Sequence, residues 1–469
     1  RMLRRRMKCV GTPMPLSADM TCSEMRLLRT PLPSITAFLA PSPAVADDAQ
    51  APRGVPVQEV TTPGGITLWL VSDSTVPMLV VSAAWQAGSA AEPASLAGVS
   101  QVTATMLTEG AGDLDANAFK VRLEELNMGL SFSAGWDWTT MTLYTLTANR
   151  DEAVELARLA LTQPRFDIEP LQRIQRQLVV GIRQRETNAG FIANLAMDQA
   201  LIPGHPYASR LTLEGVSGIT QDALRTRWRE QFTRASLRVT VVGDIAPADA
   251  TALVDRLFSE LPAGAGPETV PLATIGAAAA APIVRPLPQP QSLVLFAAPG
   301  IQDTDPDWIP LFVANHILGS GDFTSRLMTE VREERGLVYG VSTSPSVRES
   351  SAFIRGSAQT ENADVAEAIA TIRETMAAYA ADGPTQEEVD MAILYLTGSF
   401  PLSLDSNTGI AGVLSGYQTA GRSVDYVNRR NALIQAVTRE DVARAARRFF
   451  NPDAYTFVVV GQPEGLGAP

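Results

Sequence analysis

The stretch SLRVTVVGDI at residues 236–245 has a counterpart in DAYTFVVVGQ at residues 453–462. Both stretches are rich in β-branched residues, which favour strands, and both run into a Val-Gly step. Each follows a segment rich in arginine and aromatic residues that is typical of a helix. The spacing between Gly243 and Gly461, about 220 residues, is far longer than a solenoid unit. The sequence therefore predicts two duplicated domains.

Within each half, strands and helices occur in runs rather than in alternation. The pattern of apolar residues predicts two strands over 66–84, helices over 115–127 and 150–161, a hairpin over 129–147 and one long amphipathic helix over 167–198. Such segregation favours an α+β fold, in which helices pack on an antiparallel sheet.

The boundary between the halves is predicted from composition. Residues 262–290 are dominated by Gly, Ala and Pro and carry few charges, as is typical of a linker. We therefore expect one domain over 56–261 and a second over 291–465.

The N-terminal 46 residues differ from the rest of the chain. From Met25 a short basic start leads into a modest apolar stretch and an Ala-Val-Ala ending, which predicts a secretory signal cleaved after Ala46. Residues 1–24 look like an over-extended start. The signal at 25–46 predicts a periplasmic location, and no later stretch reaches the roughly 18 to 20 apolar residues of a membrane helix.

Charge and cysteine content exclude some functions. Lys and Arg number 38 against 50 Asp and Glu, and the net charge is −12. An acidic chain repels phosphate backbones, so we expect no nucleic-acid partner. Cys9 and Cys22 both lie in the N-terminal segment, which leaves residues 47–469 without a cysteine for a disulfide or a metal site.

Three segments carry a family resemblance. They read AGSAAEPASLAGVSQVTATMLTEGAG at 87–112, ILGSGDFTSRLMTEVREERGLVYGVSTS at 317–344 and AVTREDVARAARRFFNPDAYTFVVVG at 436–461. Their order and spacing resemble peptidase family M16, the insulinase and pitrilysin relatives, of the M16B type. The resemblance covers nearly all of residues 56–465. It implies the LuxS/MPP-like metallopeptidase fold, with two homologous α+β domains that each pack helices on an antiparallel sheet.

The zinc motif of active M16 members is missing. In HxxEH, two histidines one helical turn apart bind zinc, and the glutamate acts as general base on the bound water. By resemblance, the ligand positions hold Gln101 and Thr105, the base position holds Ala104, and the third ligand position holds Gly181. We therefore expect no metal or other cofactor in this chain, and zinc in a partner subunit.

The histidine count supports this independently of any alignment. The chain has two histidines, His205 and His316, so no HxxEH can be written anywhere in it. A site of one histidine with carboxylates stays open. His205, in PGHPYA, is either a ligand or base or, as we favour, a loop residue that hydrogen-bonds locally. For His316 we favour a helix-terminal histidine that partly satisfies carbonyl groups.

Arg332 and Tyr339 match an Arg and a Tyr that the second half of M16 enzymes sends across to the zinc site. Residues 324–335 predict a helix that ends at Gly336 and leads into a strand. The resemblance implies that both side chains donate hydrogen bonds to the substrate carbonyl and its oxyanion in trans. The alternative is an ordinary charged helix end and a half-buried strand tyrosine.

The resemblance implies a non-catalytic subunit of a heterodimeric zinc-dependent peptidase. Its expected partners are an HxxEH-bearing M16 subunit and a peptide substrate. Two alternatives remain: an inert structural homologue, like the core subunits of respiratory complexes, or a homodimeric peptide-binding pseudopeptidase. An edge strand at residues 130–134 could pair with an extended peptide.

Overall fold

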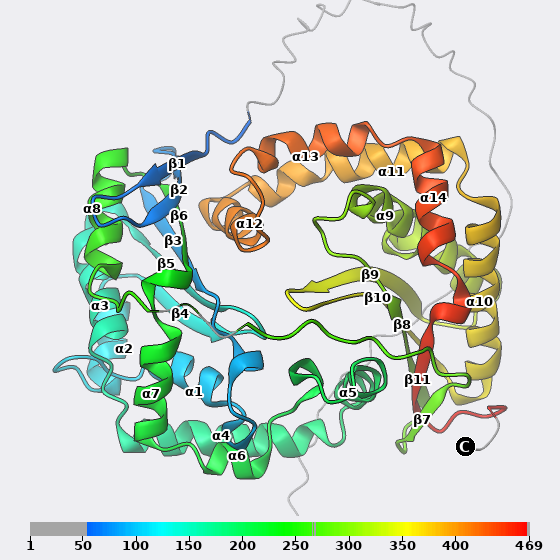
Figure 1. Ribbon diagram of the computed structural model, residues 1–469, viewed down its shortest axis with the longest axis horizontal. Coiled ribbons are helices and arrows are strands. Elements are labelled where there is room, and N and C mark those ends of the chain that lie inside the picture. Colours follow the sequence, from blue (N-terminus) through cyan, green and yellow to red (C-terminus); the bar gives the residue numbers. More distant parts are fainter. Residues whose placement is uncertain (1–53, 265, 267–268, 467–469) are drawn as a thin grey trace, which may run out of the picture. The chain divides into compact units, whose positions relative to one another are not determined.

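The computed structural model describes residues 54–264, 266 and 269–466, so the predicted signal and start at 1–46 lie outside the described residues. The first half contains a six-stranded sheet with strand order β1-β2-β6-β3-β5-β4 (Figure 1). Its strands are β1 (Gln58–Thr61), β2 (Thr67–Ser72), β3 (Met78–Trp85), β4 (Gly129–Ala134), β5 (Thr139–Leu146) and β6 (Leu237–Gly243).

The second half contains a five-stranded sheet with strand order β7-β11-β8-β10-β9. Its strands are β7 (Ile283–Pro286), β8 (Gln291–Pro299), β9 (Gly340–Arg348), β10 (Ser351–Glu361) and β11 (Thr456–Gly461). In each sheet one pair is parallel, β2 with β6 and β7 with β11, and the other pairs are antiparallel. The two sheets therefore repeat one plan, as the duplicated sequence predicts.

The paired Val-Gly steps end equivalent strands, β6 and β11. A Cβ on Gly243 would lie 2.1 Å from the Met78 carbonyl oxygen, and one on Gly461 would lie 2.2 Å from the Ser292 hydroxyl oxygen. Both glycines also have positive φ, +134° and +156°. The repeated glycine is explained by the close approach of the neighbouring strand, because only a residue without a side chain fits there.

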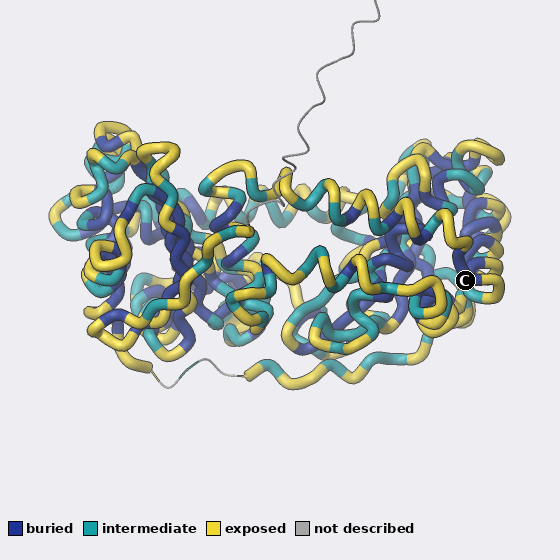
Figure 2. The backbone as a smooth tube through the Cα atoms, turned by 90° about the horizontal axis from the view of Figure 1, so that it is seen from above, coloured by how far each residue is buried: buried dark blue, intermediate teal, exposed yellow. Residues whose placement is uncertain are grey.

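Helices pack on both sheets, and the buried residues gather around them (Figure 2). The first half contributes α1 (Val99–Met106), α2 (Ala116–Glu125), α3 (Arg150–Thr162), α4 (Ile168–Arg185), α5 (Ala189–Leu201), α6 (Leu213–Ser217), α7 (Gln221–Gln231) and α8 (Pro247–Phe258). The second half contributes α9 (Trp308–Asn315), α10 (Val365–Asp382), α11 (Gln386–Gly398), α12 (Asn407–Thr419), α13 (Tyr426–Gln435) and α14 (Arg439–Phe449).

Two helices are exchanged between the halves. Helix α5, from the first half, packs on β8 and β11 of the second sheet, where Met197 joins a buried cluster with Val458. Helix α12, from the second half, packs on β3 and β6 of the first sheet, where Leu414 joins Val80. We call α5 and α12 the exchanged helices. Each sheet therefore depends on the other half for part of its cover.

The long helix predicted over 167–198 is wrong, because the chain breaks between α4 and α5. Helix α4 ends at Arg185, and Asn188 starts the next helix by accepting a hydrogen bond from the Phe191 amide at 2.8 Å. Asparagine is a favoured N-cap, so a local signal for the break is present. The break lets α5 leave the first half and reach the second sheet.

The predicted linker 262–290 needs a correction at its C-terminal end. Strand β7 lies inside this range and pairs with β11, so the second sheet begins before residue 291. Upstream of β7, the Ser350 hydroxyl donates to the Val270 carbonyl at 2.8 Å, and the Gly276 amide donates to Leu201 at 2.7 Å. Backbone amide and carbonyl groups in folded proteins are normally hydrogen-bonded, and these bonds attach the glycine- and alanine-rich segment to the rest of the fold.

The turns of two hairpins meet where the halves join. The Tyr207 hydroxyl donates to the Asp137 carboxylate in the β4–β5 turn, and the Glu349 amide in the β9–β10 turn donates to the same carboxylate at 3.2 Å. The Trp138 indole donates back to Glu349 at 3.0 Å. These hydrogen bonds connect the β4–β5 turn of the first sheet to the β9–β10 turn of the second sheet.

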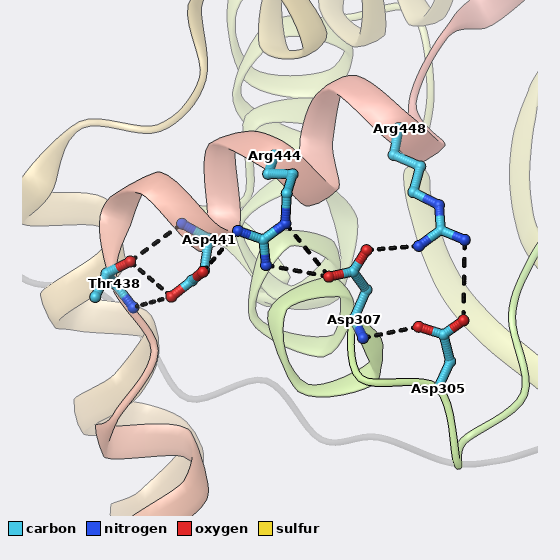
Figure 3. A network of polar contacts seen from close by, with 6 residues as sticks. All are labelled: Asp305, Asp307, Thr438, Asp441, Arg444 and Arg448. Carbon is cyan, nitrogen blue, oxygen red and sulfur yellow. Dashed lines mark hydrogen bonds and ion pairs between the residues drawn. The ribbon is translucent and has the colours of Figure 1, made fainter.

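Helix α14 is fixed to the start of α9 by ion pairs (Figure 3). Arg444 contacts Asp307 at 3.1 Å and Arg448 contacts it at 2.5 Å. At its own N-terminus, α14 has a capping box of Thr438 and Asp441. Hydrogen bonds from Thr438 and Arg444 lower the pKa of Asp441 to about 2. This network anchors the start of α9. At its other end α9 continues into Gly319, Ser320 and Gly321, which we call the glycine-rich turn.

Strands β4 and β9 end their sheets. Proline in a sheet is found at edges, because it has no amide proton for the ladder, and β9 carries Pro345. The predicted edge strand at 130–134 falls within β4, which carries neither proline nor a charged residue. Of the helices that the structure describes, none has the length and apolar character needed to cross a membrane.

Candidate functional site

The positions of the missing zinc motif lie on α1. Gln101 and Thr105 are exposed one turn apart, and the Thr105 hydroxyl donates to the Gln101 carbonyl at 2.9 Å. Ala104, at the position of the base, is buried. A carboxamide, a hydroxyl and a methyl group are not the imidazole and carboxylate groups that zinc sites use, so these residues do not fit the metal.

Gly181 lies on α4, in the region of the third ligand position. A Cβ built on it would meet no atom within 4 Å, so space does not require glycine here. Within residues 54–264, 266 and 269–466, no three His, Cys, Asp or Glu side chains are grouped to hold a metal ion. The expectation that this chain binds no zinc rests on the residue types at the motif positions.

Glu92 supports the start of α1, a role that the sequence analysis missed. Its carboxylate accepts hydrogen bonds from the amides of Gly98 at 2.6 Å and Ser100 at 3.0 Å, at the N-terminus of the helix. Helix N-termini favour such negative groups. Burial raises the pKa of Glu92, and the hydrogen bonds from Gly98 and Ser100 oppose that shift. The acidic-Pro step of the family segment therefore still holds the helix, although the metal ligands are gone.

The glycine-rich turn, formed by Gly319, Ser320 and Gly321, begins in one π-helical turn and lies before a second. The first, η6 (His316–Ser320), continues α9, and the second, η8 (Met328–Glu334), replaces most of the α-helix predicted over 324–335. Between them Asp322 has a φ of +47°, which is uncommon outside glycine. Runs of π-helix are rare and frequently occur at functional sites.

Arg332 lies on η8 and contacts the phenyl ring of Phe323, with its guanidinium carbon 4.7 Å from the ring centre. Arg332 is partly exposed, and among the described residues its guanidinium forms no hydrogen bond or ion pair, which leaves its donors able to bind another molecule. Phe323 is exposed beside the glycine-rich turn and was not predicted from the sequence. An arginine stacked on an aromatic ring keeps its charge and its donor groups available while its position is restricted.

Tyr339 lies one residue before β9. Its amide donates to the Gln359 carbonyl at 3.1 Å, so its backbone is fixed to β10, while its side chain is 61% exposed. Gly336, with a φ of +66°, ends η8 as predicted. Within the described part of the chain, the Tyr339 hydroxyl has no hydrogen-bond partner, which leaves it able to donate to another molecule.

The structure places Arg332 on η8 and Tyr339 directly before β9, and these two elements contact each other. They do not contact each other through a hydrogen bond, and in the described residues neither forms a hydrogen bond or ion pair with α1. The predicted pair therefore lies on neighbouring segments of the second half, with Tyr339 exposed and Arg332 partly exposed, and the degenerate zinc positions lie in the first half.

Two neighbours of the pair, Ser325 and Arg326, have structural roles. The Ser325 hydroxyl donates to the Asp322 carbonyl at 2.9 Å. Arg326 binds both carboxylate oxygens of Glu388, each at 2.7 Å, and stacks on Tyr379. The contact between Arg326 and Glu388 attaches this segment to the first turn of α11.

Both histidines have local partners. His205 Nε2 is 2.8 Å from the Pro271 carbonyl oxygen, and its Nδ1 accepts a hydrogen bond from the Tyr207 amide at 3.2 Å, as favoured for a loop histidine. His316 differs from the prediction. Its ring is buried and stacks on Tyr395, with ring centres 5.0 Å apart, rather than hydrogen-bonding to carbonyls at a helix end.

The stability of the fold should depend on His316 at mildly acidic pH. Burial lowers the pKa of His316, and the charge of Asp322 opposes this shift only in part. Below the ordinary histidine value of about 6.5, the unfolded chain binds a proton that the folded chain resists. Acidification therefore favours unfolding.

This dependence can be measured by urea unfolding at about pH 7.5 and about pH 5.5. The wild-type chain should lose more stability between the two values than His316→Phe, because that variant keeps the stacked ring but cannot take up a proton. Equal losses in both proteins would contradict the expectation.

Comparisons with known proteins agree with the fold and with the sequence segments. A family model described as the peptidase M16 inactive domain matches residues 218–396, a range that includes Arg332 and Tyr339. The non-peptidase homolog YmxG of Helicobacter pylori is 24% identical over 388 residues, which cover 82% of this chain and 89% of that protein.

Two further relatives extend the comparison. The mitochondrial-processing peptidase subunit beta of Blastocladiella emersonii is 24% identical over 433 residues, which cover 88% of this chain and 90% of that protein. A crystal structure of a peptidase M16 inactive domain from Pseudomonas fluorescens superimposes with a TM-score of 0.82 at 28% identity, covering 88% of this chain and 99% of that one. These matches confirm the predicted resemblance to peptidase family M16 and the predicted α+β fold class.

Proposed function

We propose that this chain is the non-catalytic subunit of a two-chain, zinc-dependent M16 peptidase. The observation that carries the proposal is the contrast between its two halves. Helix α1 offers Gln101 and Thr105 where zinc ligands would be needed. By contrast, Tyr339 is exposed, Arg332 is partly exposed, and the donor groups of both are unpaired among the described residues. Such a chain can hold a substrate but needs another chain to supply the metal.

In this proposal the partner carries HxxEH and a third carboxylate ligand, and its zinc activates the attacking water. Arg332 binds the peptide through its guanidinium, and Tyr339 donates its hydroxyl to the carbonyl oxygen as negative charge develops on it. Fixed donors at that position stabilise the transition state more than the ground state, because the charge is larger there. The beta subunit of mitochondrial-processing peptidase, one of the relatives, supports a subunit role by its name.

The predicted signal at 25–46 places the complex in the periplasm, where an HxxEH-bearing M16 protein exported by the same organism would be the partner. The competing function is that of an inert or peptide-binding homologue. It is supported by the relative from Helicobacter pylori, which is named a non-peptidase homolog.

The deciding experiment measures cleavage of a quenched-fluorescent peptide by this chain alone, by the HxxEH-bearing protein alone and by their mixture. Activity that appears in the mixture alone, and is abolished by removal of zinc with a chelator, is the expected result. Full activity of the HxxEH-bearing protein alone, unchanged by addition of this chain, would instead favour the inert or peptide-binding function.

A further inference from the structure

Helix α11 is apolar on two faces. Val389, Ala392 and Leu396 face the core of the second half and are buried. Met391, Leu394 and Tyr395, at positions i, i+3 and i+4, form a second row that is 59%, 64% and 55% exposed. We call this row the α11 stripe. A helix that is apolar all round is normally covered on all sides, so the stripe indicates a surface that receives another molecule.

The aromatic residue of the stripe is held in place. Tyr395 stacks on the buried ring of His316, with the two planes 21° apart. Large aromatic side chains that are already ordered lose little conformational entropy when a ligand covers them. Tyr395 is therefore preorganised to contact an apolar group.

A series of contacts connects the stripe to the predicted site. His316, beneath Tyr395, closely approaches the glycine-rich turn, because a Cβ built on Gly321 would lie 3.4 Å from its Nε2 atom. Phe323, two residues further on, is exposed and supports the guanidinium of Arg332. An extended chain that covers the stripe and Phe323 would therefore pass beside Arg332.

The size of the surface indicates its occupant. Aromatic side chains bury roughly 150–250 Å² each, and Met and Leu side chains are smaller, so these four side chains, each about half exposed, offer at most on the order of 500 Å². A stable subunit interface buries about 800 Å² on each partner. The surface is too small to hold a second folded chain by itself and fits a short segment of extended peptide.

We propose that Met391, Leu394, Tyr395 and Phe323 bind apolar side chains of an unfolded peptide and hold it beside Arg332. As a statement about the substrate this rests on the function proposed above, but the binding itself needs no partner subunit. The occupant is an extended segment with apolar residues at alternating positions, since these point to one side of an extended chain.

The test is fluorescence anisotropy with this chain alone and two labelled unfolded peptides. One peptide alternates Leu or Phe with polar residues, and the other has Ser at the apolar positions. The first should bind at least tenfold more tightly, and the double variant Leu394→Ser with Tyr395→Ser should lose that difference. Leu213→Ser, a change at an exposed leucine of the first half, is the matched control and should bind like the wild type.

Other results would overturn the proposal. Equal binding of both peptides would contradict it, and so would unchanged peptide binding by the double variant. A double variant that loses self-association in sedimentation analysis but still binds the peptide would show that the stripe is a contact between copies of this chain. The double variant should have the melting temperature of the wild type, which shows that it is folded. Tyr395→Phe keeps the aromatic ring and should retain peptide binding. Cleavage by the mixture with an unchanged KM in the double variant would leave the peptidase function standing without this surface. Loss of binding in the double variant without any cleavage by the mixture would leave the surface standing without that function.

Discussion

In a mixture with an HxxEH-bearing partner, Tyr339→Phe should lower kcat for peptide cleavage by about 100- to 1,000-fold, the usual effect of removing one oxyanion donor. The change removes one hydroxyl and keeps the ring. Because that hydroxyl has no partner in the described residues, its loss breaks no internal contact, and the folded chain should melt at the wild-type temperature. An unchanged KM would show that the lost interaction forms in the transition state.

The matched control is Tyr144→Phe, which removes the hydroxyl of another exposed tyrosine, on β5 of the first half. It should leave kcat unchanged. Arg332→Lys keeps the charge but not the planar group that stacks on Phe323, so we expect it to raise KM more than it lowers kcat. Wild-type kcat in Tyr339→Phe would show that this tyrosine is an ordinary strand residue.

The second large effect concerns folding. Expressed separately, residues 54–266 and residues 267–466 should each aggregate, because each fragment would expose the sheet surface that an exchanged helix covers in the whole chain. Expressed together, they should form a soluble complex that elutes as one species. A fragment that is monomeric and melts cooperatively on its own would contradict the dependence of each half on the other.

A single substitution tests the same contact in the intact chain. Leu414 of α12 is fully buried against the first sheet, so Leu414→Ala should lower the free energy of unfolding by about 2 to 5 kcal/mol. Leu402→Ala, at a residue just upstream that is largely exposed, should change it by less than about 0.5 kcal/mol. Urea titration of both variants gives the comparison.

The repeated architecture could be predicted because its causes are local. Segments rich in Val and other β-branched residues favour strands, and Gly243 and Gly461 are required by a neighbour that approaches closely in both sheets. The exchange of α5 and α12 could not be predicted. A helical pattern shows that a helix has an apolar face, but both sheets offer a similar surface to cover it. The same limitation hid the break between α4 and α5, since the apolar spacing continues across it.

The site was predicted only as far as the family motif reaches. Arg332 and Tyr339 were predicted from the family resemblance, and the exposure of Tyr339 and the partial exposure of Arg332 fit the predicted role without testing it. The π-helical turns were missed because an α-helix and a π-helix differ by one residue per hydrogen bond, which sequence periodicity does not resolve. Tyr395 was missed because α11 has two apolar faces, and only the packing shows which one is covered.

Two of the four strands that end the sheets, β4 and β9, differ in a way that matters for handling the protein. Pro345 interrupts the hydrogen-bonding row of β9, whereas β4, with the sequence GLSFSA, has no residue of the kind that blocks pairing with another strand. A concentrated solution of the chain should therefore form oligomers through β4 first. An organism that makes this protein in large excess would accumulate a species with an unprotected sheet edge, so limited synthesis would itself protect against aggregation.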